Sequence, residues 1–134
     1  MKFARLIFGA AGIYGLVVIG PMYFLEDRIG QDTPPPITHP EFFYGFVGLG
    51  VAWQIAFLCI AADPVRYRLL MIPSMVEKFS FAIAVAILVF KNRVPASVAA
   101  FAGIDLILGI LFVIAFLRTA GPRSSALPKE PRTQ

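Results

Sequence analysis

Hydrophobic residues fall in four long runs along the chain, separated by short polar stretches. Each run has about 20 residues, the length that an α-helix needs to cross the hydrocarbon core of a bilayer. A membrane span must satisfy its own backbone hydrogen bonds, and the runs lack the alternation typical of barrel strands. The sequence therefore predicts an all-α, four-transmembrane-helix bundle, with helices over residues 4–25, 41–62, 69–90 and 95–117.

The segments between the runs differ in character. Residues 26–40 contain three consecutive prolines, which predicts an extended, semi-rigid connection. Asp63 and Pro64 resemble an N-cap followed by proline at the first helical position, so the third helix is expected to start almost at once. The prediction is one membrane domain over residues 1–118 and a flexible cytoplasmic tail over 119–134.

The first run begins after two basic residues, Lys2 and Arg5, as a signal peptide does. Its apolar stretch continues to Leu25, and no small-x-small cleavage pattern precedes Glu26. We therefore expect a retained helix.

Composition supports the membrane assignment. Apolar residues make up 58% of the 134 residues and charged residues 15%, whereas soluble domains carry roughly 25% charged residues. The basic residues lie beside the apolar runs, which favours anionic lipid over nucleic acid as the partner of the net positive charge. Arg66 and Arg68 are expected to reach lipid headgroups.

Basic residues are distributed unevenly between the two sides of the predicted bundle. If the N-terminus is cytoplasmic, the inner segments hold Lys2, Arg5, Arg66, Arg68, Arg118, Arg123, Lys129 and Arg132. The outer segments hold Arg28, Lys91 and Arg93. The positive-inside rule then predicts cytoplasmic N- and C-termini, and we expect a multi-pass protein of a bacterial inner membrane.

Ionisable residues inside the spans are the strongest functional signal, because such groups are costly in lipid. Glu77, Lys78 and Asp105 lie within predicted spans, and Gln54 lies at a similar depth by the helical rise of about 1.5 Å per residue. Lys78 is rotated about 100° from Glu77 around the helix. The sequence therefore predicts a Lys78–Asp105 pair and a separate Glu77–Gln54 contact.

Three interpretations of this polar centre remain open. It is a hydrogen-bonded network that fixes helix register, a site for a ligand, proton or ion, or a set of lipid-facing groups. Trp53 lies deep in the second run and either packs in the core or forms a wall for a lipophilic ligand.

Small residues predict close helix contacts. One stripe in the second run comprises Gly45, Gly48, Ala52 and Ala56, opposite Gln54, so one of these two faces is expected to meet a further neighbour or another protomer. In the first run, Gly9, Gly12 and Gly15 are expected to play a similar part.

Sequence motifs for a cofactor or metal are absent: there is no GxGxxG, P-loop, HExxH, GxSxG or CxxCH. The single histidine, His39, excludes a bis-histidine haem within this chain alone, and the single cysteine, Cys59, leaves no CxxC pair. Glu41, in a first helical turn, is explained by the helix dipole, and a catalytic or metal pair with His39 is the alternative, for which no third ligand is evident. We predict no cofactor and no metal.

The stretches EFFYGF at 41–46, Trp53-Gln54, DPVRYR at 63–68 and Glu77-Lys78 read like the signature of an uncharacterised bacterial membrane family. With four helices and inside termini, the chain resembles the small bacterial DoxX-like integral membrane proteins. The resemblance implies an accessory role in membrane redox or stress physiology and carries over no site residue.

Two functions from different classes follow. The first is binding of a lipophilic small molecule or a membrane partner subunit through the polar centre, formed by Trp53, Gln54, Glu77, Lys78 and Asp105. The second is a small membrane enzyme or carrier that uses Glu77 and Asp105 as proton-handling groups. The absence of catalytic motifs favours the non-enzymatic function, with the bilayer as one partner and a homo-oligomer or partner subunit as another.

Overall fold

The computed structural model describes residues 1–119, and within them the chain is helical without strands. The elements are α1 (Lys2–Ile19), η1 (Gly20–Phe24), α2 (Glu26–Asp32), α3 (Pro40–Ala62), η2 (Arg68–Leu70), α4 (Met71–Phe90) and α5 (Val98–Arg118). The predicted all-α fold is confirmed.

Four helices are long and apolar enough to cross a membrane: Lys2–Phe24, Pro40–Ala62, Arg68–Phe90 and Val98–Arg118. The largest difference from the predicted ends is three residues, at the start of the fourth helix, predicted at residue 95 and observed at 98. Thr119, predicted to begin the tail, is buried, and its Oγ1 donates a hydrogen bond of 2.8 Å to the Ala115 carbonyl. The rest of the predicted tail, residues 120–134, lies outside the described residues.

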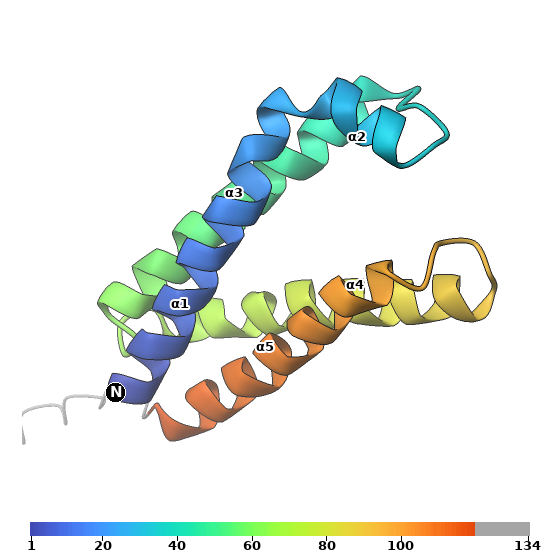
Figure 1. Cartoon of the computed structure of the whole chain (residues 1–134). Helices are drawn as coiled ribbons and strands as arrows, with labels where there is room; N and C mark the ends of the chain where they lie inside the picture. Colours follow the sequence, from blue (N-terminus) through green and yellow to red (C-terminus); the bar gives the residue numbers. More distant parts are fainter. Residues whose placement is uncertain (120–134) are drawn as a thin grey trace, which may run out of the picture.

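The four helices form two hairpins. α1 packs along α3, which we call the first hairpin, and α4 packs along α5, which we call the second hairpin. Figure 1 shows the hairpins meeting near the N-terminus, the closed end, and diverging toward the open end, where α2 and the α4–α5 connection lie. The predicted four-helix bundle is thus confirmed, with the hairpins packed on each other only at the closed end.

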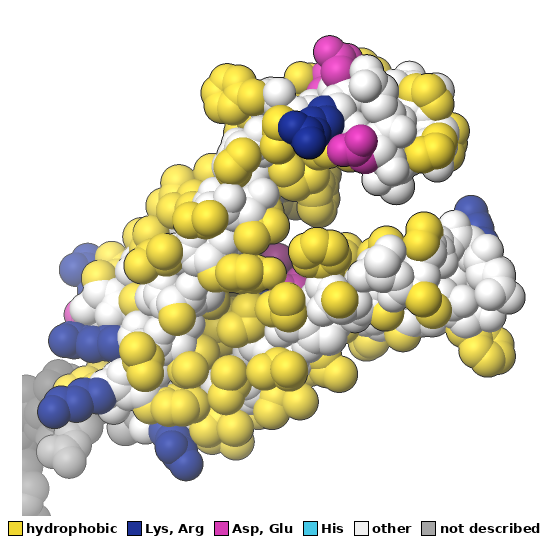
Figure 2. Space-filling model, in the orientation of Figure 1, with side chains coloured by type: hydrophobic (Ala, Val, Ile, Leu, Met, Phe, Trp, Pro, Cys, Tyr) yellow, Lys and Arg dark blue, Asp and Glu magenta, His cyan; other side chains and the backbone are white. Residues whose placement is uncertain are grey.

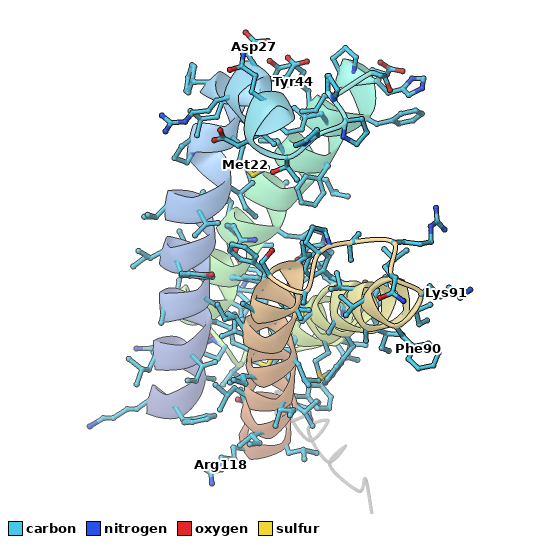
Figure 3. The ribbon with its side chains drawn as sticks, turned by 45° about the vertical axis from the view of Figure 1, so that its right-hand side comes forward. Met22, Asp27, Tyr44, Phe90, Lys91 and Arg118 are labelled. Atoms are coloured by element: carbon cyan, nitrogen blue, oxygen red, sulfur yellow. The ribbon has the colours of Figure 1, made fainter. Side chains whose placement is uncertain are left out.

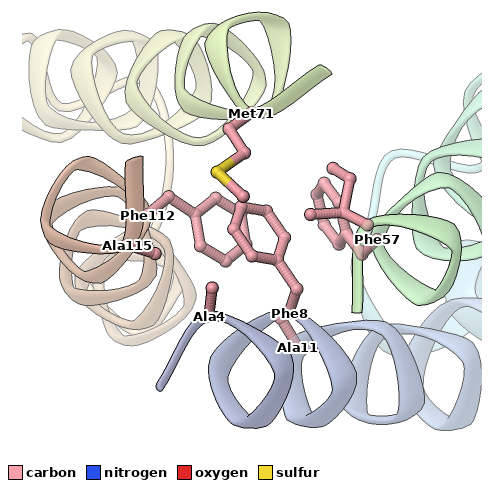
Figure 4. Close-up of a cluster of buried hydrophobic side chains, with 8 residues drawn as sticks. Ala4, Phe8, Ala11, Phe57, Met71, Phe112 and Ala115 are labelled. Carbon is pink, nitrogen blue, oxygen red and sulfur yellow. The ribbon is translucent and has the colours of Figure 1, made fainter. Parts of the chain in front are cut away.

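An aromatic cluster joins the hairpins at the closed end (Figure 4). Phe8, Phe57 and Phe112 are fully buried and come from α1, α3 and α5. Phe8 stacks on Phe112 with 4.0 Å between ring centroids, and Phe57 meets Phe112 edge-on at 5.1 Å. Met71, at the start of α4, completes the contact and is also fully buried. Each such aromatic pair contributes roughly 0.5–1.5 kcal/mol beyond its area, so this cluster fixes the meeting point of the hairpins.

Glycines let α1 and α3 approach closely, as predicted for the first helix. A Cβ built on Gly12 would lie 2.8 Å from the Leu58 side chain and 2.9 Å from the Gln54 backbone oxygen. A Cβ on Gly15 would collide with the Gln54 side chain. The first hairpin therefore depends on glycine at these positions.

The connection over residues 26–40 is not wholly extended, contrary to the prediction. Residues Glu26–Asp32 form α2, in which Arg28 and Asp32 make an i, i+4 ion pair of 3.5 Å. Glu26 and Asp27 lie in its first turn, where acidic residues favour the helix dipole. Proline prevents helix only from residue 34 onward, so the extended prediction was wrong for the first half of the segment.

The prediction that Asp63 caps the third helix, with Pro64 at its first position, was wrong, although the span begins within one residue of its predicted start. Asp63 Oδ1 accepts a hydrogen bond of 3.1 Å from the Arg66 backbone N–H, which closes a turn rather than capping a helix. The membrane helix begins with η2 at Arg68 and continues as α4 from Met71. The short connection between the hairpins is therefore a turn beside the closed end.

Candidate functional site

Lys78 is the centre of the candidate site. It lies on the face of α4 that packs against α5, and it is 6% exposed. Its Nζ lies 3.1 Å from Oδ1 of Asp105 on α5. α4 and α5 pack along their lengths, and this distance between Nζ and Oδ1 confirms the predicted Lys78–Asp105 pair.

Glu77 belongs to the same group, contrary to the prediction that it lies apart. Lys78 Nζ donates a hydrogen bond of 3.3 Å to Glu77 Oε1 and lies 3.2 Å from Oε2. The two residues leave the helix about 100° apart, but the lysine stem of four carbons is long enough to turn back to its neighbour. We call Glu77, Lys78 and Asp105 the acid–lysine centre.

The acid–lysine centre contains two carboxylates and one ammonium. The side chains of Glu77, Lys78 and Asp105 are 25%, 7% and 17% exposed, so all three are largely removed from the surface. Oε2 of Glu77 is buried and accepts no hydrogen bond of suitable geometry from residues 1–119, although it lies within ion-pair distance of Nζ. With every group ionised the formal charge of the centre is −1.

Phe57 also contacts the centre, and sequence reasoning missed it. Lys78 Nζ lies 5.4 Å from the centroid of the Phe57 ring, within the range of a cation–π interaction. Because Phe57 also belongs to the closed-end aromatic cluster, it links the acid–lysine centre to the junction of the hairpins. Its position one turn after Trp53 on α3 was the signal that could have identified it.

Gln54 does not join this group, so the predicted Glu77–Gln54 contact was wrong. Gln54 is 1% exposed and packs against α1 beside Gly15. Its Nε2 donates a hydrogen bond of 3.1 Å to the Gly50 carbonyl of its own helix. Within residues 1–119 it makes no hydrogen bond to Glu77. It is a structural residue of the first hairpin.

Trp53 lies on the neighbouring face of α3 and is half-buried. Its ring centroid lies 6.2 Å from that of Phe57, and it packs against the edge of the closed-end cluster. Trp53 is thus separated from the acid–lysine centre by one aromatic ring.

The space-filling view shows an open notch between the two hairpins (Figure 2). Acidic atoms are visible at its base, whereas yellow hydrophobic atoms cover much of the visible face of both hairpins. The partial exposure of Glu77 and Asp105 agrees with access from this notch. A ligand that entered between the hairpins would therefore meet a polar group inside an apolar surrounding.

Arg68, which was predicted to reach lipid headgroups, contacts the end of α5. Its Nε donates a hydrogen bond of 2.6 Å to the Thr119 carbonyl, and its Nη2 donates one of 3.3 Å to the Phe116 carbonyl. Its guanidinium also lies 3.7 Å from the Phe116 ring centroid. Arg68 therefore caps the last turn of α5. Arg66 is exposed and stays available for the predicted headgroup contact.

The small-residue stripe of α3 is open at Gly45 and Ala52. A Cβ on Gly45 would meet nothing within 4 Å, and Ala52 is exposed. Gly48 lies near the Tyr23 hydroxyl, at 3.1 Å from its built Cβ. The close approach of helices in the first hairpin thus occurs through the α1 glycines and not through this stripe.

Side chains able to ligate a metal do not gather in the described part of the chain: residues 1–119 hold no group of three or more His, Cys, Asp or Glu in suitable positions. His39 Nδ1 contacts Glu41 Oε1 at 3.3 Å on the exposed end of α3, and Cys59 is exposed on the same helix.

No protein family, curated protein or solved structure matches the chain. The class of protein therefore rests on its own helices. In each of the four spans only 22–28% of the most apolar window is buried inside the protein. Their remaining surface carries large exposed hydrophobic side chains such as Leu6, Ile107 and Leu117, which water would not solvate favourably. The chain is a multi-pass membrane protein.

Proposed function

We propose that the chain binds a lipophilic molecule in the notch between its hairpins and holds the polar head of that molecule at the acid–lysine centre. One observation carries the proposal. The Lys78 ammonium is shared between the Glu77 and Asp105 carboxylates within membrane spans, and both acidic side chains stay partly exposed.

The energetics of buried charge support a binding role. A charged residue at the centre of a span costs about 2.5–3.5 kcal/mol on insertion scales. Replacing a buried ion pair by apolar residues is often neutral or stabilising, so a purely structural contact does not require these three residues. The formal charge of −1 and the partial exposure of the Glu77 and Asp105 side chains favour a ligand whose head is a cation or a hydrogen-bond donor.

Trp53 provides a direct test, because it is the single tryptophan of the chain and lies beside Phe57. The experiment measures energy transfer from Trp53 to a dansyl-labelled long-chain alkylammonium in nanodiscs of neutral phosphatidylcholine. We expect saturable transfer, and a dansyl-labelled alkylsulfonate of the same chain length should give only the unsaturable transfer of a probe dissolved in the lipid.

The Glu77→Gln variant should weaken ammonium binding, while Glu41→Gln, which changes an exposed carboxylate outside the centre, should leave it unchanged. Equal transfer to both probes, or no saturation with either, would show that the notch does not bind a cationic amphiphile.

A proton-handling carrier is the second candidate function. It is favoured by the contact of one ammonium with two carboxylates, since such a group offers alternative positions for a proton. Proteoliposomes containing a pH-sensitive dye would test it. A proton flux across the membrane that Glu77→Gln abolishes would favour the carrier over simple binding.

We also propose that both termini face the cytoplasm of a bacterial inner membrane, and that the chain has the accessory role of the DoxX-like proteins that it resembles. The excess of basic residues at the closed end supports this orientation. The outward face of α3 at Gly45 supports contact with a second copy or a partner subunit.

A further inference from the structure

The open ends of the two hairpins carry opposite charge. The end of the first hairpin holds four carboxylates, Glu26, Asp27, Asp32 and Glu41, and one guanidinium, Arg28, which gives a formal charge of −3 with His39 neutral. We call these residues the acidic tip. The end of the second hairpin holds Lys91 and Arg93 and no acidic residue, a formal charge of +2 that we call the basic tip.

The two tips belong to different hairpins and lie across the mouth of the notch. Figure 3 labels Asp27 near the end of the first hairpin and Lys91 near the end of the second. Figure 2 shows acidic atoms on one lobe and basic atoms at the far end of the other, with the notch between them.

The charges of both tips are available for new contacts. Lys91 and Arg93 are exposed, and neither makes an ion pair with any residue in 1–119. On the acidic tip, Arg28 pairs with Asp32 and His39 contacts Glu41, yet these four side chains stay between 65% and 78% exposed. The acidic tip therefore has unbalanced charge that the basic tip can neutralise.

The fold provides a hinge for such a contact. The hairpins are joined by the turn after Asp63, by the closed-end aromatic cluster and by packing of α1 on α5, whereas α1 with α3 and α4 with α5 pack along their lengths. Between two apolar faces in lipid there is no hydrophobic driving force, since lipid tails are as apolar as the side chains that they cover. Attraction between the opposite charges of the tips therefore lowers the free energy of a closed arrangement relative to an open one.

We propose that the hairpins close at their open ends, with the acidic tip docking on the basic tip and covering the notch. This movement goes beyond the proposed ligand and does not depend on it. Closure would bring the apolar walls of the notch together and separate the acid–lysine centre from the surrounding lipid.

Distances between spin labels test the closure. Labels at Thr38→Cys and Ala96→Cys, both exposed at the tips, are introduced into a Cys59→Ala chain in phosphatidylcholine nanodiscs, and pulsed electron resonance gives their distance distribution. We expect a short-distance population beside the open one. Lys91→Glu with Arg93→Glu should lower the ratio of closed to open by about fivefold, the effect of roughly two exposed ion pairs, and high salt should also lower it.

A charge exchange makes the test specific. Glu26→Lys with Asp27→Lys, added to the reversed basic tip, should restore the short-distance population, while Lys2→Glu at the closed end should leave it unchanged. Three results would each overturn the proposal: a distribution that ignores charge reversal, a failure of the exchange to restore it, or loss of the short distance when labelled chain is diluted with unlabelled chain. The last would place the contact between copies.

Discussion

Lys78 holds together two groups that would repel each other without it. Its ammonium lies between the carboxylates of Glu77 and Asp105, and the Phe57 ring lies near the same ammonium. In a medium of low polarity, loss of one charge from such a group leaves the others buried without a partner, which costs more than loss of the whole group.

Lys78→Met should therefore destabilise the protein strongly, by about 3–5 kcal/mol, because it leaves two carboxylates unpaired. The free energy of unfolding can be measured by titration with sodium dodecyl sulfate in mixed micelles, followed by circular dichroism. The triple variant Glu77→Gln, Lys78→Met, Asp105→Asn should lose less than half as much. A triple variant that is less stable than Lys78→Met would contradict the coupling of these charges.

The site shows which residue contacts a single sequence can predict. Lys78–Asp105 followed from depth and helical direction, because both residues lie deep in adjacent spans. The contact of Lys78 with Glu77 was missed because the direction in which a side chain leaves its Cα does not fix where the ammonium of a long, flexible lysine lies. Gln54 was placed wrongly because α3 is apolar on all sides, so its sequence does not say which face meets α1 and which meets the second hairpin.

At the scale of elements, each hairpin is stabilised by a different kind of contact. Glycines allow α1 to approach α3, whereas Arg68 connects the start of the third span to the end of α5 through two backbone carbonyls. Carbonyls in the last turn of a helix lack partners within the helix, and a guanidinium satisfies them while favouring the helix dipole.

Gly12→Ala should weaken the first hairpin, because the added methyl would meet the Gln54 backbone oxygen, which cannot move away as a side chain can. Overpacking of this kind costs about 1–3 kcal/mol. The matched control is Gly103→Ala on α5, where the methyl meets nothing within 4 Å and should stabilise the helix by about 0.5–1 kcal/mol. Thermal unfolding monitored by circular dichroism compares the two, and equal effects would argue against close α1–α3 packing.

Arg68→Ala should release the last turn of α5. Hydrogen bonds to charged groups contribute about 1.5–3 kcal/mol each, so we expect a loss of that order and faster amide hydrogen exchange near Phe116. Arg66→Ala, at an exposed position two residues earlier, should change stability by less than about 0.5 kcal/mol. If both variants unfold and exchange alike, Arg68 does not cap α5.

The elements differ in how well the sequence predicts them. The four spans were predictable because each is a long apolar run whose length is set by the bilayer. The helix α2 was missed because residues 26–40 were treated as one proline-rich segment, although Glu26–Asp32 contain no proline. Asp63 was wrongly assigned as the N-cap of the third helix because an Asp-Pro pair suits a turn as well as a helix N-terminus.

At the scale of the whole molecule, the divergence of the hairpins decides what the protein can bind. Four helices in a closed bundle would enclose the acid–lysine centre, whereas two hairpins that diverge from one end leave a notch between them (Figure 2) and the Glu77 and Asp105 side chains partly exposed. This arrangement could not be predicted from the sequence, because apolar faces in lipid do not reveal whether a helix or a lipid chain covers them.

The proposed orientation makes a prediction for the intact membrane. Single cysteines at Thr38 and Ser97, in a Cys59→Ala chain, should react with a membrane-impermeant maleimide added to the periplasmic side of cells, while a cysteine at Arg66 should not. Cells permeabilised before labelling serve as the control in which all three react. The reverse pattern would show that the termini face outward.

The pairing of Lys78 with both acids inside a bilayer can be measured by solid-state NMR. Lys2, Lys91 and Lys129 are replaced by Arg, so that Lys78 is the single lysine, and its ¹⁵Nζ is observed together with ¹³C-labelled Asp and Glu carboxyl groups in lipid bilayers. We predict ¹⁵N–¹³C dipolar coupling to one Asp and one Glu carboxyl carbon, with the Asp coupling lost in Asp105→Asn and the Glu coupling lost in Glu77→Gln. An Nζ that shows no coupling to either carboxyl group would contradict the acid–lysine centre.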